Sequence, residues 1–243
     1  MDQQTKAMLK QDEFLTVGSH GLEWAGQNRR SVIVSAGILL AVIVAAVLAI
    51  VIYQHRSEKA SEAFGGAMQT YQTPLAAPGQ AVPPGVKTFA SVTDRAKAAS
   101  AQFMAVATQY GSTPDGKNAR YFAGLTYVEA GQTAIAEETL KKVAGGWNHD
   151  LADLSRLALA QLYRQTARNP QAIEMYKQIA AKPSTAVPAG VAKLQLADLY
   201  MGENKPEEAR KIYAELKDKD GKSAAGVIAA QKLNPGAAQA PQM

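Results

Sequence analysis

An uninterrupted apolar stretch at residues 32–53 constrains this chain more than any other feature. The stretch contains no charged side chain, and Ser35 is its only strongly polar residue before Tyr53. As a helix it would rise about 1.5 Å per residue and extend about 33 Å, which is enough to cross a hydrocarbon core of about 30 Å. We therefore expect a single membrane-spanning helix that contacts the lipid bilayer.

Two other structures produce apolar stretches of this kind. One is a helix buried in a protein core, but this stretch is apolar on every face and has charges beyond both ends. The other is a cleaved signal peptide, whose apolar region has about 7–15 residues and precedes a cleavage site between small residues. Here the stretch is longer, and the charged segment 54–59 follows it. A retained anchor fits these observations best.

The charges on either side of the anchor bear on its orientation. Arg29 and Arg30 precede it, whereas Arg56 and Lys59 follow it. Together with two more distant lysines of the leader, the basic residues before the anchor outnumber those directly after it, which slightly favours a cytoplasmic N-terminus. In a Gram-negative bacterium the larger C-terminal part would then face the periplasm. The expected location is the bacterial inner membrane, which the chain would cross once.

The composition and the scattered histidines argue against several kinds of function. A net charge of +5 over 243 residues, with acidic and basic residues interspersed, is too weak to indicate nucleic-acid binding. The chain has no cysteine, which excludes disulfides, thiol chemistry and thiolate metal sites. His20, His55 and His149 have no partner at the spacing of metal ligands, and nucleotide-binding and hydrolase motifs are absent. We predict no catalytic residue, no metal, no cofactor and no small-molecule substrate.

A repeated pattern dominates the chain after residue 92. Tyr127, Tyr163 and Tyr200 recur at intervals of 36 and 37 residues. A small residue lies three positions before each tyrosine, an alanine lies nine positions after it, and bulky residues follow four and seven positions beyond that alanine. Small residues let two helices approach closely, and bulky ones fill the space between repeats. In repeat order these residues are Gly124, Ala136, Leu140 and Val143, then Ala160, Ala172, Tyr176 and Ile179, then Ala197, Ala209, Tyr213 and Leu216.

This spacing resembles the tetratricopeptide repeat, a helix–turn–helix unit of about 34 residues. The sequence departs from the consensus at the first aromatic position, where Arg120, Arg156 and Lys193 stand, and Pro183 is the nearest match to a closing proline. An alanine-rich bundle with chance periodicity is the alternative. The fold class implied by the resemblance is all-α, with one N-terminal transmembrane helix followed by an α-solenoid of tetratricopeptide-like helical hairpins.

The expected domain order runs from a short leader to a terminal tail. A helix at 57–72 would pair with one that carries Ala99, Phe103 and Val106, with the proline-rich segment as an insertion between them. Residues 223–233 would form the capping helix that an open repeat stack requires. The leader would be a short interfacial helix or an unstructured tail. The boundaries are 1–31 for the cytoplasmic leader, 32–53 for the transmembrane helix, 54–91 for the post-anchor helix and proline-rich insertion, 92–233 for the repeat domain with its capping helix, and 234–243 for a disordered tail.

The first helices of stacked repeats line a concave face, where we expect a shallow groove for an extended or helical peptide. Tyr121, Leu157 and Leu194 would give this groove an apolar edge. The alternative is that these three side chains belong to the core between repeats. The predicted groove residues are Asn118, Tyr121, Leu125 and Glu129 in the first repeat, Leu157, Gln161 and Arg164 in the second, and Leu194, Asp198 and Met201 in the third.

The order of leader, anchor, post-anchor helix and small repeat domain resembles the bacterial ancillary translocon-subunit family. Members of that family carry their repeat domain in the periplasm, beside the protein-export channel. The resemblance implies a non-catalytic scaffold with chaperone-like handling of exported polypeptides, and protein partners among channel subunits and those polypeptides. An adaptor for cell-envelope assembly or division is the alternative function. An enzyme would require a catalytic constellation that the sequence does not contain.

Overall fold

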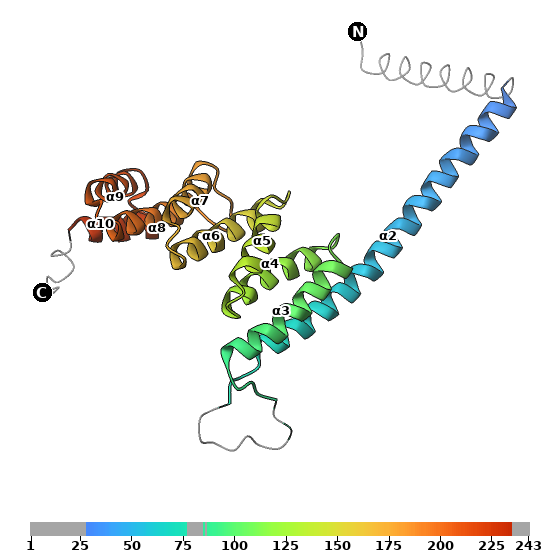
Figure 1. The fold of residues 1–243 in the computed structure, drawn as a ribbon. Coiled ribbons are helices and arrows are strands. Elements are labelled where there is room, and N and C mark those ends of the chain that lie inside the picture. Colours follow the sequence, from blue (N-terminus) through green and yellow to red (C-terminus); the bar gives the residue numbers. More distant parts are fainter. Residues whose placement is uncertain (1–27, 77–84, 86, 235–243) are drawn as a thin grey trace, which may run out of the picture. The chain divides into compact units, whose positions relative to one another are not determined.

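The computed structural model describes residues 28–76, 85 and 87–234, and the regular elements within them are helices (Figure 1). Leu75 and Phe89 form an isolated β-bridge. The all-α prediction is therefore confirmed for this part of the chain. Almost all of the predicted leader and tail lies outside the described residues. The helices are α2 (Arg29–Gln72), α3 (Val92–Gln109), α4 (Pro114–Glu129), α5 (Thr133–Ala144), α6 (His149–Gln165), α7 (Asn169–Ala181), α8 (Ala189–Gly202), α9 (Pro206–Asp220) and α10 (Ala224–Leu233).

The helix α2 contains the apolar stretch and continues beyond it. Its most apolar 18-residue window has a mean hydropathy of 3.0, and none of that window is buried inside the protein. By length and composition the helix is able to cross a membrane. It does not end near Tyr53 but continues through Gly65 and Gly66 to Gln72, so the expected post-anchor helix is the last part of α2. Residues up to His55 and residues from Arg56 onward belong to two separate units.

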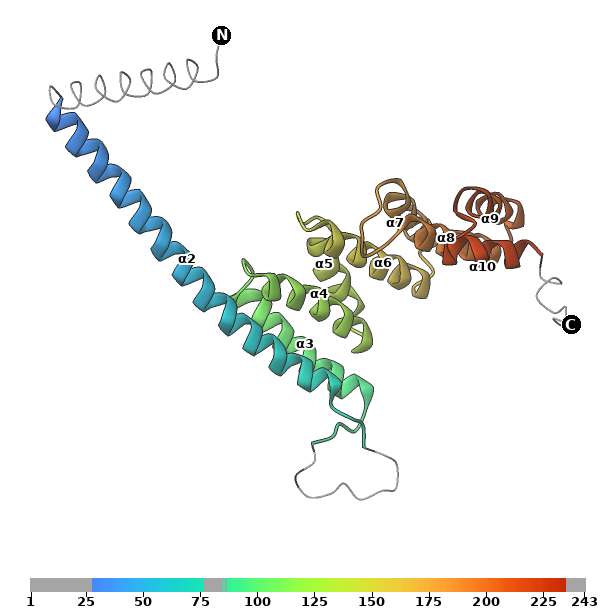
Figure 2. The same ribbon diagram turned by 180° about the vertical axis from the view of Figure 1, so that it is seen from behind.

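The second unit consists of helices that pack on their neighbours in the sequence. The helix α4 packs against both α3 and α5, and the same kind of contact continues along the chain to α9 and α10. Figures 1 and 2 show α4 and α5, α6 and α7, and α8 and α9 as successive helical pairs. Contacts between α4 and α6 join the first helices of consecutive repeats. This arrangement is a tetratricopeptide-like α-solenoid, as the spacing predicts.

The residues of the repeated pattern form the cores between these helices. All three alanines nine positions after a tyrosine are fully buried, and so are the bulky residues Leu140 and Tyr176. At the small position, Gly124 faces Leu140, and a Cβ atom added to Gly124 would lie 2.6 Å from the Leu140 Cδ2 atom. Because that distance is well below van der Waals contact, the close approach of α4 to α5 depends on glycine at this position.

The last part of α2 and the helix α3 form a hairpin that precedes the three repeats. Ala67 lies in one core cluster with Ala99 and Phe103. The Phe64 ring lies 5.7 Å from the Phe103 ring, and the Phe122 ring of α4 lies 5.6 Å and 5.4 Å from these two rings. These contacts hold the two helices together and join the hairpin to the first repeat. The helix α10, at the place where a capping helix is expected, packs on α8 and α9.

The three repeats share one turn between their two helices. The chain takes a left-handed conformation four residues after each tyrosine, at Gly131 (φ 74°), Ala167 (φ 56°) and Asn204 (φ 59°). The amide of the following residue donates a hydrogen bond of 2.7 to 2.9 Å to the carbonyl oxygen of that tyrosine. This is the Schellman arrangement of a helix C-terminus. In the second repeat, Asn169 and Pro170 form the first turn of α7, and the turn between the two helices is centred on Ala167.

Candidate protein-binding surface

The predicted groove residues lie on α4, α6 and α8, the first helices of the three repeats. None of the ten is fully buried, so each retains some surface that a partner can contact. Their exposure separates them into two groups. The exposed residues are Glu129, Gln161, Arg164 and Met201, and the half-buried ones are Asn118, Tyr121, Leu125, Leu157, Leu194 and Asp198.

The three apolar residues at equivalent positions pack against cores between the repeats. Tyr121 and Leu157 contact the cluster that contains Leu140 and Tyr176, and Leu194 contacts a separate cluster near the C-terminal end. Burial raises the pKa of Tyr121, so its hydroxyl is neutral in the usual pH range. Each of these side chains therefore contributes to the core with one part and presents another part at the surface. Both interpretations of the sequence, groove edge and inter-repeat core, remain compatible with this packing.

Three polar residues of the predicted groove form hydrogen bonds with neighbouring helices. Glu129 accepts a hydrogen bond of 2.6 Å from the Tyr71 hydroxyl of α2, and burial together with this bond raises the pKa of Tyr71 to about 12. Arg164 donates a hydrogen bond of 3.1 Å to a side chain of α8. Asp198 accepts hydrogen bonds from Tyr213 at 2.7 Å and from a lysine of α10 at 3.0 Å. These contacts hold the surface side chains in defined positions.

Two pockets contain predicted residues. Gln161 and Arg164 line a pocket of about 370 Å³ on α6. Asp198 and Met201 line another, of about 550 Å³, which α9 and α10 also border. The first-repeat residues contribute to neither pocket. The structure thus brings together predicted residues of the second repeat and of the third, but these two pockets do not join all ten into one cavity.

Residues 23–235 match a protein family described as a tetratricopeptide repeat-like domain. The chain belongs to this family. No curated protein matches it significantly.

This chain is similar in fold to two crystal structures, each with a TM-score of 0.52. Both structures show TPR-like repeats of a Podosopora anserina protein assigned as a kinesin light chain. The sequence identities are 16% and 15%; the alignments cover 74% and 73% of this chain and 84% of the other chain in both cases. At such identities the likeness establishes the solenoid fold alone. Solenoids of this kind present extended surfaces for protein–protein interaction.

This tetratricopeptide repeat-like domain uses arginine where the consensus has its first aromatic residue. The Arg156 guanidinium donates a hydrogen bond of 2.9 Å to the carbonyl oxygen of Ala144 at the end of α5, and Arg120 makes the equivalent bond of 3.3 Å to Ala107 near the end of α3. A cation at a helix C-terminus stabilises the unpaired carbonyl groups there. Lys193 of the third repeat instead pairs with a glutamate of α9 at 3.1 Å. The sequence shows a basic residue at the same position of each repeat, but it does not show which carbonyl or carboxylate group accepts its hydrogen bond.

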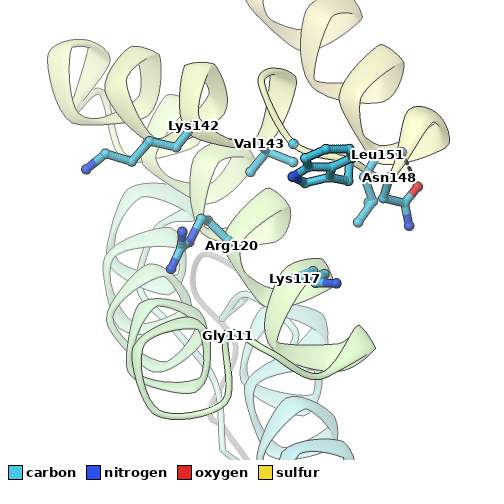
Figure 3. Close-up of a pocket in the computed structure, with 9 residues that line it drawn as sticks. Gly111, Lys117, Arg120, Lys142, Val143, Asn148 and Leu151 are labelled. Carbon is cyan, nitrogen blue, oxygen red and sulfur yellow. Dashed lines mark hydrogen bonds between the residues drawn. The ribbon is translucent and has the colours of Figure 1, made fainter.

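A further pocket of about 210 Å³, which sequence reasoning missed, lies where the N-terminal half of α4 meets the end of α5 and the start of α6 (Figure 3). None of the ten predicted residues lines it. Its cations are Lys117, Arg120 and Lys142, and its apolar side chains include Trp147, which is fully exposed with a relative accessibility of 104%. The signal in the sequence was a tryptophan directly after the helix-ending Gly145-Gly146 pair.

Within residues 28–76, 85 and 87–234, no group of three or more His, Cys, Asp or Glu side chains is arranged to hold a metal ion. The family's fold is typically non-catalytic.

Proposed function

We propose that this protein is a non-catalytic, membrane-tethered scaffold with a chaperone-like role at a bacterial protein-export channel. Its N-terminus is cytoplasmic, and its repeat domain lies in the periplasm. The face formed by α4, α6 and α8 binds channel subunits or exported polypeptides. The order of elements along the chain, which resembles the ancillary translocon-subunit family, supports this assignment, as does membership of the tetratricopeptide repeat-like family.

The observation that carries the proposal is the continuity of α2. This helix includes the apolar stretch and, without interruption, the segment that packs as the first partner of α3. Along the chain, the anchor and the first partner of α3 therefore belong to one helix. A tether of this kind keeps a binding surface near membrane partners and raises their effective concentration, so weak binding is sufficient.

The composition of the proposed face suits weak and varied polypeptide binding. It combines half-buried apolar side chains such as Leu157 with exposed polar ones such as Gln161 and Arg164. Extended or helical peptides bind such grooves through a few apolar anchors and surrounding hydrogen bonds. Because both signs of charge are present, binding does not depend on a strongly charged partner.

A photo-crosslinking amino acid at Gln161 or Met201, introduced in intact cells, tests this proposal. Both side chains are exposed, so the replacement does not disturb the core. Lys177 on α7, which is exposed on a second helix of a repeat, is the matched control position. We expect channel subunits and exported polypeptides to be crosslinked from the first two positions and not from Lys177. Capture of a single envelope-assembly or division complex would replace the proposal with the adaptor function, and capture of cytosolic proteins alone would reverse the topology.

A second experiment distinguishes a partner-binding role of Leu157 from a purely structural role in the core. Leu157→Glu places a charge on the proposed face at a half-buried position, and Gln161→Glu places one at a neighbouring exposed position. If the face binds partners, both variants lose crosslinks from Met201, and Gln161→Glu does so without lowering the unfolding temperature in detergent micelles. If these positions serve the core alone, Gln161→Glu retains the crosslinks, and Leu157→Glu unfolds at a markedly lower temperature.

A further inference from the structure

The charged side chains that line the pocket between α4, α5 and α6 are all positive. Its lining contains the cations of Lys117, Arg120 and Lys142 and no carboxylate. Within the described part of the chain, the Lys117 ammonium group has no ion pair or hydrogen bond, and Arg120 uses one guanidinium nitrogen on a carbonyl oxygen and keeps its other donors. Lys142 pairs with Glu138 at 2.7 Å, but both side chains are more than half exposed, so this pair contributes little and exchanges readily. The pocket therefore attracts an anionic group.

The same pocket also offers apolar surface. Val143 and Leu151, each 9% exposed, lie in its lining, and the fully exposed Trp147 side chain borders it (Figure 3 labels the first two). A tryptophan at this exposure contributes nothing to the core, although indole is among the largest apolar groups available. Tryptophan and arginine are the residue types most enriched among the energetically important contacts of protein interfaces. The combination therefore fits a partner that carries both an apolar side chain and negative charge.

The size and shape of the pocket narrow the class of partner. Its volume of about 210 Å³ is smaller than the roughly 300–1,000 Å³ typical of pockets for small organic ligands. It accommodates one large side chain. Because the N-terminal half of α4, the end of α5 and the start of α6 form its walls, it is a concavity that a protruding side chain can enter, whereas a flat lipid surface would contact only its rim.

We propose that this pocket binds an acidic peptide segment of a partner protein, in which one large apolar side chain is flanked by Asp or Glu. The apolar side chain packs between Trp147, Val143 and Leu151. The flanking carboxylates pair with Lys117, Arg120 and Lys142. The inference rests on the proposed function only in taking the partner to be a protein, since none of the pocket residues belongs to the predicted groove.

Fluorescence polarisation with the full-length protein in neutral detergent micelles tests this site. The probe is a fluorescein-labelled peptide of sequence SGDEFDGS. Two control peptides are SGNQFNGS, which lacks the charges, and SGDEADGS, which lacks the apolar side chain. We expect saturable binding of the probe, with at least tenfold weaker binding of each control peptide. Raising the salt concentration should weaken probe binding several-fold because the charges are solvent-exposed.

Matched variants locate the binding. A double variant that combines Lys117→Gln and Lys142→Gln should bind the probe at least tenfold more weakly. Trp147→Ser should bind it at least fivefold more weakly. The pair Lys177→Gln and Lys211→Gln, which removes two exposed lysines of α7 and α9, should leave binding unchanged. In a Trp24→Phe background, the emission of Trp147 should shift to shorter wavelength when unlabelled SGDEFDGS binds. The side chains of Lys117, Lys142, Trp147, Lys177 and Lys211 are exposed, so circular dichroism of these variants should report an unchanged fold.

Three results would overturn the proposal. One is equal binding of the acidic probe and SGNQFNGS; another is unchanged binding by the Lys117/Lys142 variant. The third is capture of phosphatidylglycerol vesicles, lost in that variant, without any binding of the probe, which would assign the pocket to anionic lipid. The proposed function is tested separately, because groove variants such as Gln161→Glu should abolish crosslinks and leave probe binding intact.

Discussion

The turns inside the repeats are alike, whereas the connections between repeats differ. All three internal turns place one residue in the left-handed conformation and close with the same pair of hydrogen bonds. Of the connections, 145–148 carries the exposed Trp147, and 182–188 buries Val187. The first and last, 110–113 and 221–223, each end in a hydroxyl that caps the next helix.

The difference follows from what each segment must do. An internal turn joins two antiparallel helices whose separation is set by buried alanines, so only a narrow range of geometries returns the chain correctly. A connection only has to reach the start of the next repeat, and several lengths achieve this. Sequence variation is therefore tolerated in the connections. The pocket with Trp147 lies at one of them, as expected if binding features accumulate where the fold constrains the chain least.

The largest predicted effect distinguishes a tight connection from a loose one. A Cβ atom at Gly116 would lie 1.9 Å from the carbonyl oxygen of Tyr110, whereas at Gly145 its nearest neighbour would be 3.6 Å away. Since a backbone oxygen cannot move aside without shifting the chain, Gly116→Ala should destabilise the protein by about 3 kcal/mol, and Gly145→Ala by less than about 0.5 kcal/mol. Urea unfolding of the full chain in micelles, followed by circular dichroism, measures both.

The last connection provides a replicate of this experiment. Gly226 stands in the same place after Ser223, and its added Cβ would lie 2.1 Å from the carbonyl oxygen of Asp220. Gly226→Ala should therefore resemble Gly116→Ala. Coincident unfolding midpoints for Gly116→Ala and Gly145→Ala would contradict the division into tight and loose connections.

A substitution in an internal turn should have a smaller effect on stability, and it should stabilise the protein. Ala167 has φ 56° where the first repeat has Gly131. A left-handed alanine costs about 1–2 kcal/mol, and glycine loses about 0.5–1 kcal/mol more in conformational entropy on folding. Ala167→Gly should therefore stabilise the protein by roughly 0.5–1 kcal/mol, and Gly131→Ala should destabilise it by a similar amount.

The control for these variants is Ala105→Gly, an exposed position inside α3. Glycine within a helix costs about 1 kcal/mol, so this variant should unfold at lower urea concentration while Ala167→Gly unfolds at higher concentration. A loss of stability in both would show that the turn of the second repeat does not carry backbone strain.

The repeat cores could be predicted from the sequence, because burial imposes a residue size at a fixed spacing. The small, alanine and bulky positions all belong to the cores, and the helix pairs follow from them. The strained turn could not be predicted in the second repeat, since an alanine such as Ala167 does not signal a left-handed conformation. The continuity of α2 between the predicted helices at 32–53 and 57–72 was also missed. In the last part of α2, the packing of Phe64 and Ala67 against α3 outweighs the weak helix propensity of Gly65 and Gly66.

The surface was less predictable than the core. The groove residues lie on the expected helices, but their contacts join residues far apart in the sequence, as between Glu129 and Tyr71, 58 positions earlier. The pocket draws its cations from two helices and its indole from the connection that follows, so no local motif encodes it. The groove itself stays a prediction, because packing alone does not distinguish a binding edge from a partly exposed core.

A still smaller effect concerns the glutamate that joins the second internal turn to α5. Glu137 accepts hydrogen bonds or ion pairs from Lys141, Arg168 and Tyr163, and the contact with Lys141 is the main reason that its pKa lies below the ordinary value of 4.5. A lowered pKa means that the charged form stabilises the fold above the unfolded-state pKa, and that this stabilisation disappears as the pH falls through the lower folded-state pKa.

Glu137→Gln should therefore lower the unfolding temperature at pH 7, and the difference from the wild type should shrink below about pH 4.5 as the wild-type carboxylate becomes protonated. Glu138→Gln is the control, because Glu138 is solvent-exposed and, among the described residues, pairs with Lys142 alone. Thermal unfolding measured between pH 3 and pH 7 compares the two. A pH-independent difference for Glu137→Gln would assign its effect to packing rather than to charge.

The smallest predicted effect lies in the connection that carries the proposed binding site. Trp147→Ser should change the free energy of unfolding by less than about 0.5 kcal/mol, because a fully exposed side chain loses no buried contacts. Leu151, which lines the same pocket but is 9% exposed, provides the contrast, since truncating a buried leucine to alanine costs about 2–5 kcal/mol. Urea unfolding of both variants measures this difference. A destabilising Trp147→Ser would mean that the indole supports the fold; an unchanged stability leaves this large apolar side chain without a structural role and therefore free for a partner.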